Sequence, residues 1–371
     1  MIVTASFAPE VSPRSFRATE RARELARQGH AVTVVTPRSA GIPRLWDVEK
    51  RVYLKDMGPP RFHLPHFGET GVSRFLTRIT GRFLTLFFEF PDIQYMFLIR
   101  KALAHEEGYD LLISVAVPYP VHWGVALVHS PQRRIATTWV ADCGDPYMGN
   151  RLDRFRKPFY FRYAEKWFMR KCDYVTIPRE EFKINFYPEF HQRMVAIPQG
   201  FRFEEVNRLP RHSPNGIPRF AFAGSLIRET RDPGKFLTYL ASLSGAFHFI
   251  LYTRSTELVA PFLLLLNGKM EVRDYIPRDE LLRELAGMDF LVNFEYDPMV
   301  QSPSKLIDYA LTGRPVLNIN AKTFSAAVVD AFLVGDYRQR FEFPDLEKFR
   351  IEHVAASFLK LIDGNRAGQE C

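Results

Sequence analysis

A serine, a lysine and an aspartate are spaced along one short predicted helix in the second half of the chain. The segment reads Gln301-Ser-Pro-Ser-Lys-Leu-Ile-Asp-Tyr-Ala-Leu-Thr-Gly-Arg-Pro-Val-Leu, and Gly313 ends the helix. Ser304 and Lys305 stand at the helix start, where free backbone N–H groups and a basic side chain bind anions such as a diphosphate. Asp308 follows one turn later and can reach hydroxyl groups attached to that phosphate. The same residues also fit a helix start that is merely capped.

A turn between two other predicted elements offers a second phosphate-binding group. It follows the strand-like run Arg219-Phe-Ala-Phe-Ala, and its candidate diphosphate-binding residues are Gly224, Ser225, Arg228 and Arg231. Glycine lets the backbone approach a phosphate closely, and arginines can clamp the charge that develops on a leaving diphosphate. The alternative is a basic turn that is only solvated.

Three further residues are candidates for a general base, because each comes just after a predicted strand. They are Asp142, Asp145 and His122. A carboxylate or imidazole within hydrogen-bond reach of a hydroxyl group can accept its proton. The alternatives are turn or cap residues for the two aspartates, and a structural role for His122 beside Trp123.

Short apolar strands that alternate with helices must position these side chains. The runs Met1–Ser6 and Ala31–Thr36 surround an amphipathic helix over 15–28, and Phe290–Phe294 leads into the lysine-bearing segment. Such βαβ units predict parallel sheets, with ligands gathered at the carboxyl ends of the strands.

The lysine-bearing segment resembles a pattern of known enzymes, "P-S-K-x-x-E-Y-x-x-x-G-x-P-V". This pattern belongs to GT-B fold glycosyltransferases, above all to the large retaining family, of the family-four type, that uses nucleoside-diphosphate sugars for surface polysaccharide assembly. The resemblance implies that Lys305 contacts the donor diphosphate and that Asp308, in place of the usual Glu, holds the ribose. The first Glu of the family pattern falls on Val300, so its contact with the sugar is missing or displaced, to Gln301 or Glu295.

Other segments resemble the same enzymes in the same order. Residues 23–36 are similar to the "L-x-x-x-G-H-x-V-x-V-x-T" opening, and residues 134–146 to "W-V-x-D-x-R-D-P", with Gly144 where that pattern has Arg. The implied fold is α/β, GT-B, with two Rossmann-like domains whose parallel sheets face each other across a cleft. In that fold the loop after the first strand faces the cleft, which places Ser12, Arg14 and Ser15 near donor or acceptor.

Composition and the resemblance together predict the domain boundaries. Residues 202–218 are rich in Arg, Pro, Glu and Asn without apolar periodicity, which is typical of a linker. We expect an acceptor-side domain over 1–201, a nucleotide-sugar-binding domain over 219–345, and a C-terminal helix over 346–371 that packs back on the first domain.

Neither a metal nor a cofactor is predicted. The chain contains no Asp-x-Asp pair, no dinucleotide-binding glycine pattern, no Walker loop and no His-Glu-x-x-His. Charge on a diphosphate would therefore be neutralised by Lys305, arginines and the helix N-terminus. The net charge of +8 suits anionic ligands or an anionic surface, but no nucleic-acid-binding module is recognisable.

The 371 residues, 46% hydrophobic and 25% charged, are those of a globular protein able to bury two cores. No apolar run is long enough to cross a bilayer, and no signal peptide is evident at the N-terminus. The cysteines, Cys143, Cys172 and Cys371, lack metal-like spacing and indicate reduced thiols. These features predict a cytoplasmic location.

Residues 71–90 predict a basic amphipathic helix. Arg74, Arg78 and Arg82 recur every four residues beside an apolar stripe formed by Phe75, Ile79, Phe83 and Leu86. Such a helix can lie on an anionic membrane surface, here the inner face of the cell membrane, or it can simply pack on the first domain.

We therefore expect a hexosyltransferase, of the retaining type by resemblance, that moves a sugar from a nucleoside-diphosphate donor to a hydroxyl of a glycan or polyprenyl-linked acceptor. Two alternatives stay open. One is a GT-B nucleotide-sugar 2-epimerase. The other is a non-catalytic sugar-nucleotide-binding scaffold, which the missing Glu at Val300 allows.

Overall fold

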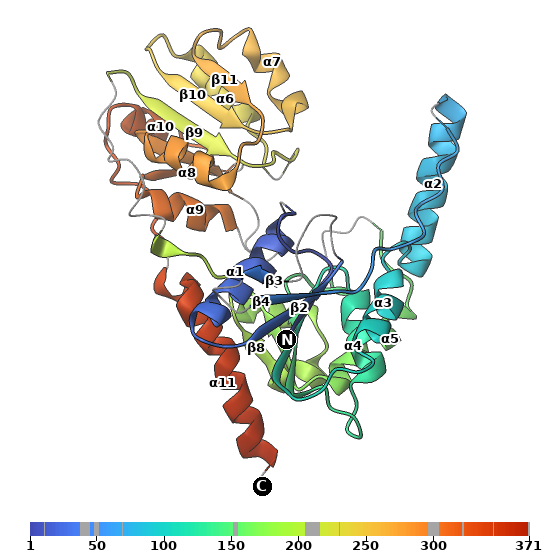
Figure 1. The fold of residues 1–371 in the computed structure, drawn as a ribbon. Coiled ribbons are helices and arrows are strands. Elements are labelled where there is room, and N and C mark those ends of the chain that lie inside the picture. The colour runs from blue at the N-terminus through green and yellow to red at the C-terminus, as the bar shows by residue number, and fades with distance from the viewer. Residues whose placement is uncertain are drawn as a thin grey trace. The chain divides into compact units, whose positions relative to one another are not determined.

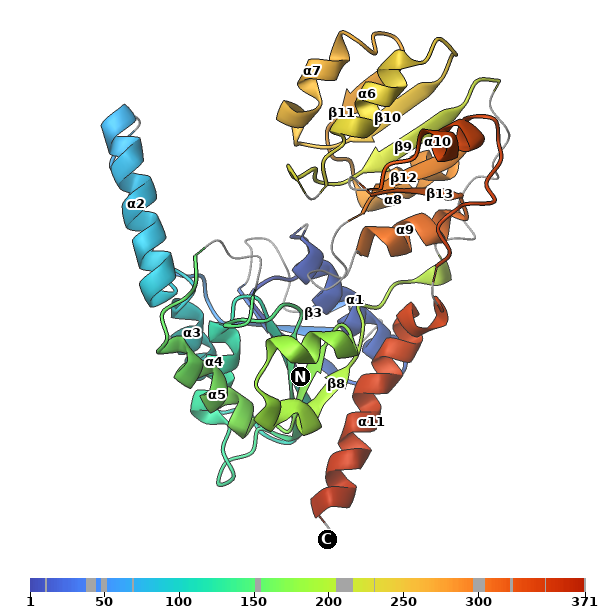
Figure 2. The same cartoon turned by 180° about the vertical axis from the view of Figure 1, so that it is seen from behind.

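The chain forms two compact units, each built around its own β-sheet (Figures 1 and 2). Unit 1 comprises Met1–Phe201 with Lys348–Cys371, and unit 2 comprises Arg202–Glu347. The computed structural model describes residues 1–10, 12–37, 45–47, 52–68, 70–150, 155–204, 216–229, 231–295, 304–320, 323–343 and 345–369. The predicted α/β class with two Rossmann-like sheets is confirmed.

The sheet of unit 1 has the order β3-β4-β2-β1-β5-β6-β7-β8. Seven of these strands run parallel, and β3 pairs antiparallel with β4 at one edge. The order reverses direction between β1 and β5, and in open α/β sheets ligands bind beyond the carboxyl ends at such a switch point. The strands are β1 (Ile2–Thr4), β2 (Val32–Thr36), β3 (Leu45–Asp47), β4 (Val52–Asp56), β5 (Tyr109–Ala116), β6 (Ala136–Cys143), β7 (Tyr174–Ile177) and β8 (Met194–Ala196).

Helices connect these strands and cover the sheet (Figure 1). They are α1 (Pro13–Arg27), α2 (Gly71–Phe88), α3 (Gln94–Ala102), α4 (Pro120–Val128), α5 (Phe161–Lys171) and α11 (Ile351–Gln369), with 3₁₀ turns at Glu180–Asn185, Pro188–Arg193 and Glu347–Phe349. The last helix, α11, packs beside α1, and its buried side chains Val354, Ala355 and Phe358 join the core on that face of the sheet.

Unit 2 has a five-stranded parallel sheet in the order β11-β10-β9-β12-β13. The direction in which successive strands are added to the sheet reverses between β9 and β12. The strands are β9 (Arg219–Ala223), β10 (His248–Tyr252), β11 (Met270–Arg273), β12 (Phe290–Phe294) and β13 (Val316–Ile319). The helices are α6 (Gly234–Ser242), α7 (Ala260–Leu263), α8 (Arg278–Ala286), α9 (Ser304–Thr312) and α10 (Ala326–Leu333), with a 3₁₀ turn at Thr256–Leu258.

Alternation along the strands of unit 2 separates two apolar faces. Phe220, Phe249 and Phe290 stack on one face, with ring centroids 4.5 to 4.9 Å apart. The other face carries smaller side chains such as Ala221 and Ala223, which leave room for α8 and α9. Because parallel strands are covered on both faces, the sequence presents near-continuous hydrophobic runs.

The helix α2 stands out from the rest of unit 1 in both ribbon views (Figures 1 and 2). Gly81 is its buried residue, and the preceding segment packs there, with Leu64 Cδ1 3.6 Å from the position of a Cβ at residue 81. The amide N–H of Phe67 donates to Thr77 Oγ1 at 3.0 Å. None of the helices within the described ranges is both long and apolar enough to cross a bilayer.

Candidate functional site

The predicted lysine-bearing helix forms as α9, from Ser304 to the glycine that ends it. Gly313 has a φ of +67°, which a glycine adopts without strain, and Thr312 Oγ1 accepts a hydrogen bond from the N–H of Arg314 at 3.2 Å. Backbone atoms of Ser304 begin the helix, but its side chain, together with Val300 and Gln301, lies outside the described residues. The phosphate-binding role of Ser304 therefore stays a prediction.

Lys305 is held in an apolar place at the carboxyl end of β9. Its Nζ lies 4.4 Å from the ring centroid of Phe222 and 3.7 Å from the position of a Cβ at Gly224. This nitrogen is buried and has no hydrogen-bond partner among the described residues. Burial, and then the charge of Arg231, lower the pKa of Lys305 to about 7. A buried ammonium without an acceptor is costly, so the arrangement favours an anionic ligand.

The turn after β9 begins at a glycine with a positive φ and carries exposed polar side chains. Gly224 has a φ of +138°, a conformation that side chains of L-residues rarely adopt. Ser225 Oγ lies 3.1 Å from Tyr275 OH, and both are exposed. Arg228 is exposed at the tip of a short loop closed by backbone hydrogen bonds between Ile227 and Arg231.

Asp308 is engaged by an arginine from the neighbouring helix α8. Arg278 Nε and Nη2 donate to Asp308 Oδ1 at 2.9 and 2.7 Å, and both side chains are about one-fifth exposed. The sequence did not indicate this pair, because the two residues are 30 positions apart. The carboxylate predicted to hold the ribose is thus oriented by a fixed guanidinium.

Tyr309 anchors α9 to the strand that carries the glycine turn. Its hydroxyl, fully buried, accepts a hydrogen bond from Ala223 N–H at 2.8 Å. This contact fixes the spacing between Lys305 and Gly224. The tyrosine is part of the sequence pattern quoted above, but its partner is set by the fold.

In unit 1, Asp142 is buried and paired with two arginines. Its side chain is 0% exposed, with Arg17 Nη2 at 2.7 Å, Arg21 Nη1 at 2.9 Å and Thr176 Oγ1 at 2.9 Å. Burial pushes the pKa of Asp142 upward, but the two guanidinium charges and the hydrogen bonds outweigh it and hold the pKa below its usual value. A carboxylate so engaged does not reach a substrate hydroxyl, which corrects its prediction as a general base.

His122 is likewise unsuited to proton transfer with a substrate. The ring is fully buried, with Nδ1 2.8 Å from Ser114 Oγ, and it stacks on Phe168. Burial lowers the pKa of His122 to about 3. His122 therefore has a structural role, which corrects its prediction as a general base.

Asp145 is the candidate base that remains exposed at the carboxyl end of β6. Its backbone carbonyl accepts a hydrogen bond from Tyr119 OH at 2.6 Å, which fixes the turn. The neighbouring Gly144 is equally informative, because Arg17 Nη1 lies 2.7 Å from the position of a Cβ there. A guanidinium from α1 therefore occupies the space beside the residue where the related pattern has an arginine.

The three predicted residues of the first loop lie at the N-terminus of α1. Ser12 is the N-cap, and its Oγ accepts a hydrogen bond from Ser15 N–H at 3.1 Å. Ser15 is buried, whereas Arg14 is exposed. Arg14 is thus the one whose side chain is presented to solvent. In the part of the chain that the structure describes, no group of three His, Cys, Asp or Glu side chains is placed to hold a metal ion.

Comparison with known proteins identifies the fold. A glycosyltransferase from Rickettsia africae has a similar structure, with a TM-score of 0.56 and 12% identity over 100% of this chain and 96% of that one. Anabaena Alr3699/HepE, solved with UDP-glucose, has a TM-score of 0.58 and 9% identity over 98% of this chain and 99% of that one. The lipopolysaccharide outer core galactosyltransferase WaaB has a TM-score of 0.54 and 11% identity over 98% of both chains. These likenesses define the GT-B fold.

The chain therefore has the GT-B fold. Its residues 15–185 match the sequence profile of the glycosyl transferase 4-like domain, in agreement with the resemblance seen in the sequence. No curated protein sequence is recognisably similar to the chain.

Proposed function

We propose that this enzyme transfers a hexosyl unit from a nucleoside-diphosphate sugar to a hydroxyl group of a glycan or lipid-linked acceptor, in polysaccharide or lipopolysaccharide assembly. The observation that carries the proposal is the buried Nζ of Lys305 beside Gly224, which lacks an acceptor among the described side chains. A diphosphate would supply that acceptor through charge-assisted hydrogen bonds. HepE was solved in complex with UDP-glucose, and WaaB is described as a lipopolysaccharide outer core galactosyltransferase, which supports this class of donor and acceptor.

Bond cleavage between the sugar and the diphosphate places negative charge on the leaving phosphate. Lys305, Arg231 and Arg228 are the cations of unit 2 that we assign to that charge. In a retaining reaction the departing phosphate oxygen takes the proton of the acceptor hydroxyl on the same face of the sugar. An inverting reaction would use a separate base instead, and Asp145 is then the residue to test.

Incubation with a panel of nucleotide-sugars tests the activity. Release of nucleoside diphosphate that depends on an added glycan or polyprenyl-linked acceptor supports the transferase. A new nucleotide-sugar formed without acceptor would instead identify a 2-epimerase. Binding of nucleotide-sugar without either product would identify a scaffold.

Donor binding is expected to weaken as the pH rises above about 7, the pKa of Lys305. Below that pH the side chain is charged, and above it the free enzyme must take up a proton to bind the diphosphate. The dissociation constant of UDP-glucose should therefore be constant below pH 7 and rise by up to ~10-fold per pH unit above it. The ligand is a diester of diphosphate, so its own charge stays constant in this range.

Isothermal titration calorimetry across this pH range measures the effect. Lys305→Arg, which stays charged at every pH used, is the control and should remove the dependence. A wild-type affinity that is flat with pH would contradict a role for the Lys305 ammonium.

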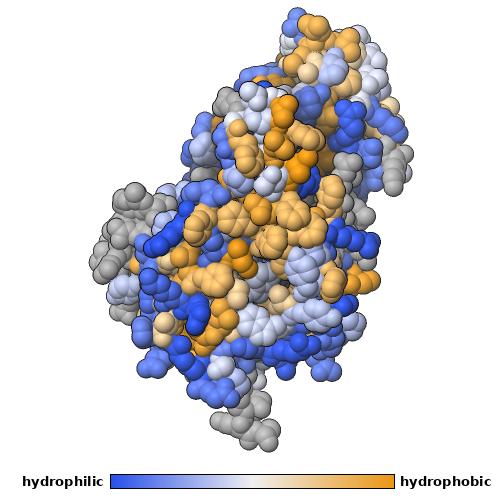
Figure 3. Space-filling view, turned by 90° about the vertical axis from the view of Figure 1, so that its right-hand side faces the viewer, coloured by the Kyte–Doolittle hydropathy of each residue, from blue (hydrophilic) through white to orange (hydrophobic). Residues whose placement is uncertain are grey.

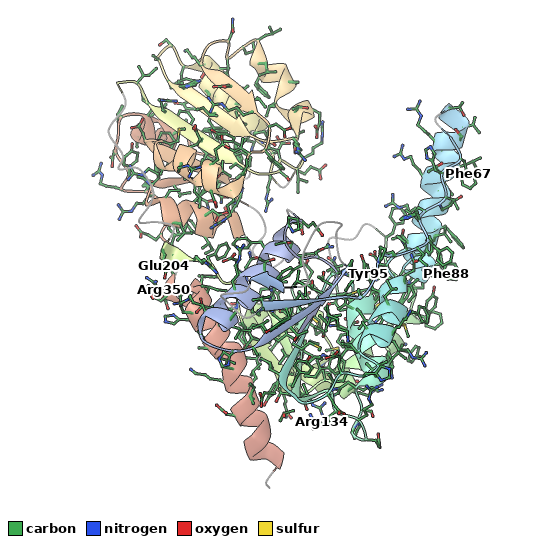
Figure 4. The ribbon with its side chains drawn as sticks, in the orientation of Figure 1. Phe67, Phe88, Tyr95, Arg134, Glu204 and Arg350 are labelled. Carbon is green, nitrogen blue, oxygen red and sulfur yellow. The ribbon has the colours of Figure 1, made fainter. Side chains whose placement is uncertain are left out.

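The acceptor side is proposed to rest on an anionic membrane surface through α2. The exposed apolar side chains of this helix, of the segment that precedes α5 and of the first turn of α5 form what we call the aromatic arm. They are Val72, Phe75, Leu76, Ile79, Phe83, Phe87, Phe88, Phe155, Phe159, Tyr160 and Tyr163. Figure 3 views this side of the molecule and shows apolar side chains gathered on it. Figure 4 labels Phe88 at the end of α2 and Phe67 beside the helix. Arg74, Arg78 and Arg82 flank the arm, and Arg82 lies 4.0 Å over the ring of Phe155. Basic charge beside exposed aromatics suits lipid headgroups.

Charge reversal at Arg74, Arg78 and Arg82 should abolish membrane binding. Each basic residue near an anionic surface contributes on the order of 1 kcal/mol, so the loss should be at least ~100-fold in partitioning. Co-sedimentation with phosphatidylcholine vesicles, with and without phosphatidylglycerol, measures it. The matched control reverses Arg283, Lys348 and Lys360, which are also exposed but lie outside α2. The proposal fails if the wild-type protein does not bind vesicles, or if both triple variants lose binding equally.

A further inference from the structure

Two guanidinium groups of α1 share one buried carboxylate at the carboxyl end of β6. Arg17 Nη2 lies 2.7 Å from Asp142 Oδ1, and Arg21 Nη1 lies 2.9 Å from Asp142 Oδ2. The side chain of Arg17 is 10% exposed, and those of Arg21 and Asp142 are fully buried. These three residues, which we call the Asp142 cluster, thus combine two positive charges with one negative charge.

The other buried carboxylates of α1 have cationic partners of their own. They form ion pairs one turn along the same helix, Glu20 with Arg23 and Glu24 with Arg27. Burial lowers the pKa of the Arg21 guanidinium, Asp142 raises it and the charge of Arg17 lowers it, and the resulting pKa is below its usual value. Among the described side chains, the Asp142 cluster therefore carries one positive charge in excess.

Arg17 is the surplus cation of the cluster. Without it each carboxylate oxygen of Asp142 keeps a partner, because Thr176 Oγ1 donates to Oδ1 at 2.9 Å and Arg21 Nη1 contacts Oδ2. Arg17 Nε is buried and has no hydrogen-bond partner among the described residues. A polar group that leaves water without a hydrogen bond costs free energy, so this guanidinium favours an additional acceptor.

The guanidinium of Arg17 lies over the turn that follows β6. Its Nη1 is 2.7 Å from the position of a Cβ at Gly144, so a side chain at that residue would collide with it. Arg14 is three residues earlier on the same face of α1 and is exposed. The strand β6 pairs with β5, at which the strand order of unit 1 reverses, and ligands of open α/β sheets bind beyond such carboxyl ends.

We infer that Arg17 binds a phosphate group of the acceptor. The inference rests on the proposed function and names the charged group that the acceptor presents to unit 1. A guanidinium has five N–H donors in a rigid fork, so Arg17 can hold Asp142 through Nη2 and a phosphate oxygen through its remaining N–H groups. The diphosphate of the donor is already assigned to Lys305 and Gly224 of unit 2, which leaves the acceptor as the source of this phosphate.

Calorimetry with geranyl diphosphate, a short prenyl diphosphate, tests the assignment on the full chain saturated with UDP, which fills the proposed donor site. Arg17→Met should weaken binding of geranyl diphosphate by ~10-fold or more, because it removes a hydrogen bond to a charged group. The dissociation constant of UDP alone should stay unchanged. Arg17→Lys keeps the charge but has one nitrogen, which Asp142 engages, so its affinity for geranyl diphosphate should also fall. Arg23→Met is the matched control on α1, because Arg23 pairs with Glu20, and should change neither affinity.

The melting temperature separates ligand binding from a structural role of Arg17. Arg17→Met should not lower it, because Asp142 keeps Thr176 and Arg21 as partners and the buried excess charge is removed. Asp142→Asn is the comparison, since it leaves both guanidinium groups without a counter-charge. A fall in Arg17→Met as large as that in Asp142→Asn would show that Arg17 serves the fold, against the inference.

Three binding results would also overturn the inference. In the first, both Arg17 variants bind geranyl diphosphate as tightly as the wild-type protein. In the second, UDP and geranyl diphosphate lose affinity equally, which would make the donor diphosphate the ligand of Arg17. In the third, the UDP-saturated wild-type protein binds no geranyl diphosphate. Failure of the wild-type protein to bind UDP is a different outcome, because it removes the proposed donor site and this inference with it.

Discussion

Replacement of Lys305 by methionine is expected to reduce donor turnover by roughly 100- to 1,000-fold, the usual effect of removing one preorganised charge from a transition state. The same change should raise the stability of unit 2. Methionine keeps the length of the side chain over the Phe222 ring, and it removes a buried ammonium without an acceptor. For a unit of this size each kcal/mol corresponds to roughly 2–4 °C in melting temperature.

Release of nucleoside diphosphate measures the first effect, and scanning calorimetry measures the second. Lys235→Met is the matched control, because that lysine is exposed at the start of α6. A fall in turnover together with a rise in melting temperature would show that Lys305 serves the reaction and not the fold. Loss of both together would show that Lys305 serves the fold.

Asp142→Asn is expected to destabilise unit 1 by about 3–5 kcal/mol, because it leaves two buried guanidinium groups without their counter-charge. Arg21 is 1% exposed and Arg17 is 10% exposed, so water cannot replace the carboxylate. The pKa of Asp142 is lowered, so this contribution is present above the ordinary aspartate pKa and is lost as the pH falls through the lowered value.

Urea unfolding followed by tryptophan fluorescence measures this effect selectively. All four tryptophans lie within residues 1–201, and Trp139 is three residues before Asp142 on β6. Glu189→Gln is the control, because its ion pair with Lys166 is about half exposed on the carboxylate side and should contribute less than ~1 kcal/mol. Equal urea midpoints for the two variants would show that the buried ion pairs of Asp142 with Arg17 and Arg21 do not stabilise unit 1.

Local signals predicted the elements around the donor site closely. The capped start and the terminal glycine placed α9 at its observed bounds, and the apolar run Phe290–Phe294 is β12 as expected. The reason is that helix ends, glycine turns and buried strands are written in consecutive residues. The basic amphipathic pattern likewise predicted the helix α2.

Long-range pairing explains what the sequence could not indicate. Asp142 looks like a cleft carboxylate because it ends a strand, but Arg17 and Arg21 neutralise it from more than 120 residues away. Asp308 and Arg278 meet only because α8 and α9 pack side by side. The hydrogen bond from Asn293 Nδ2 on β12 to Asn318 Oδ1 on β13, at 2.6 Å, depends on strand register, which hydrophobic runs alone do not set.

A crystal structure of the enzyme with UDP bound tests the central claim most directly. We expect diphosphate oxygens within about 2.7–3.2 Å of Lys305 Nζ and of the backbone N–H groups that follow Gly224. A nucleotide bound with its diphosphate away from α9, and with Lys305 still resting on Phe222, would contradict the account.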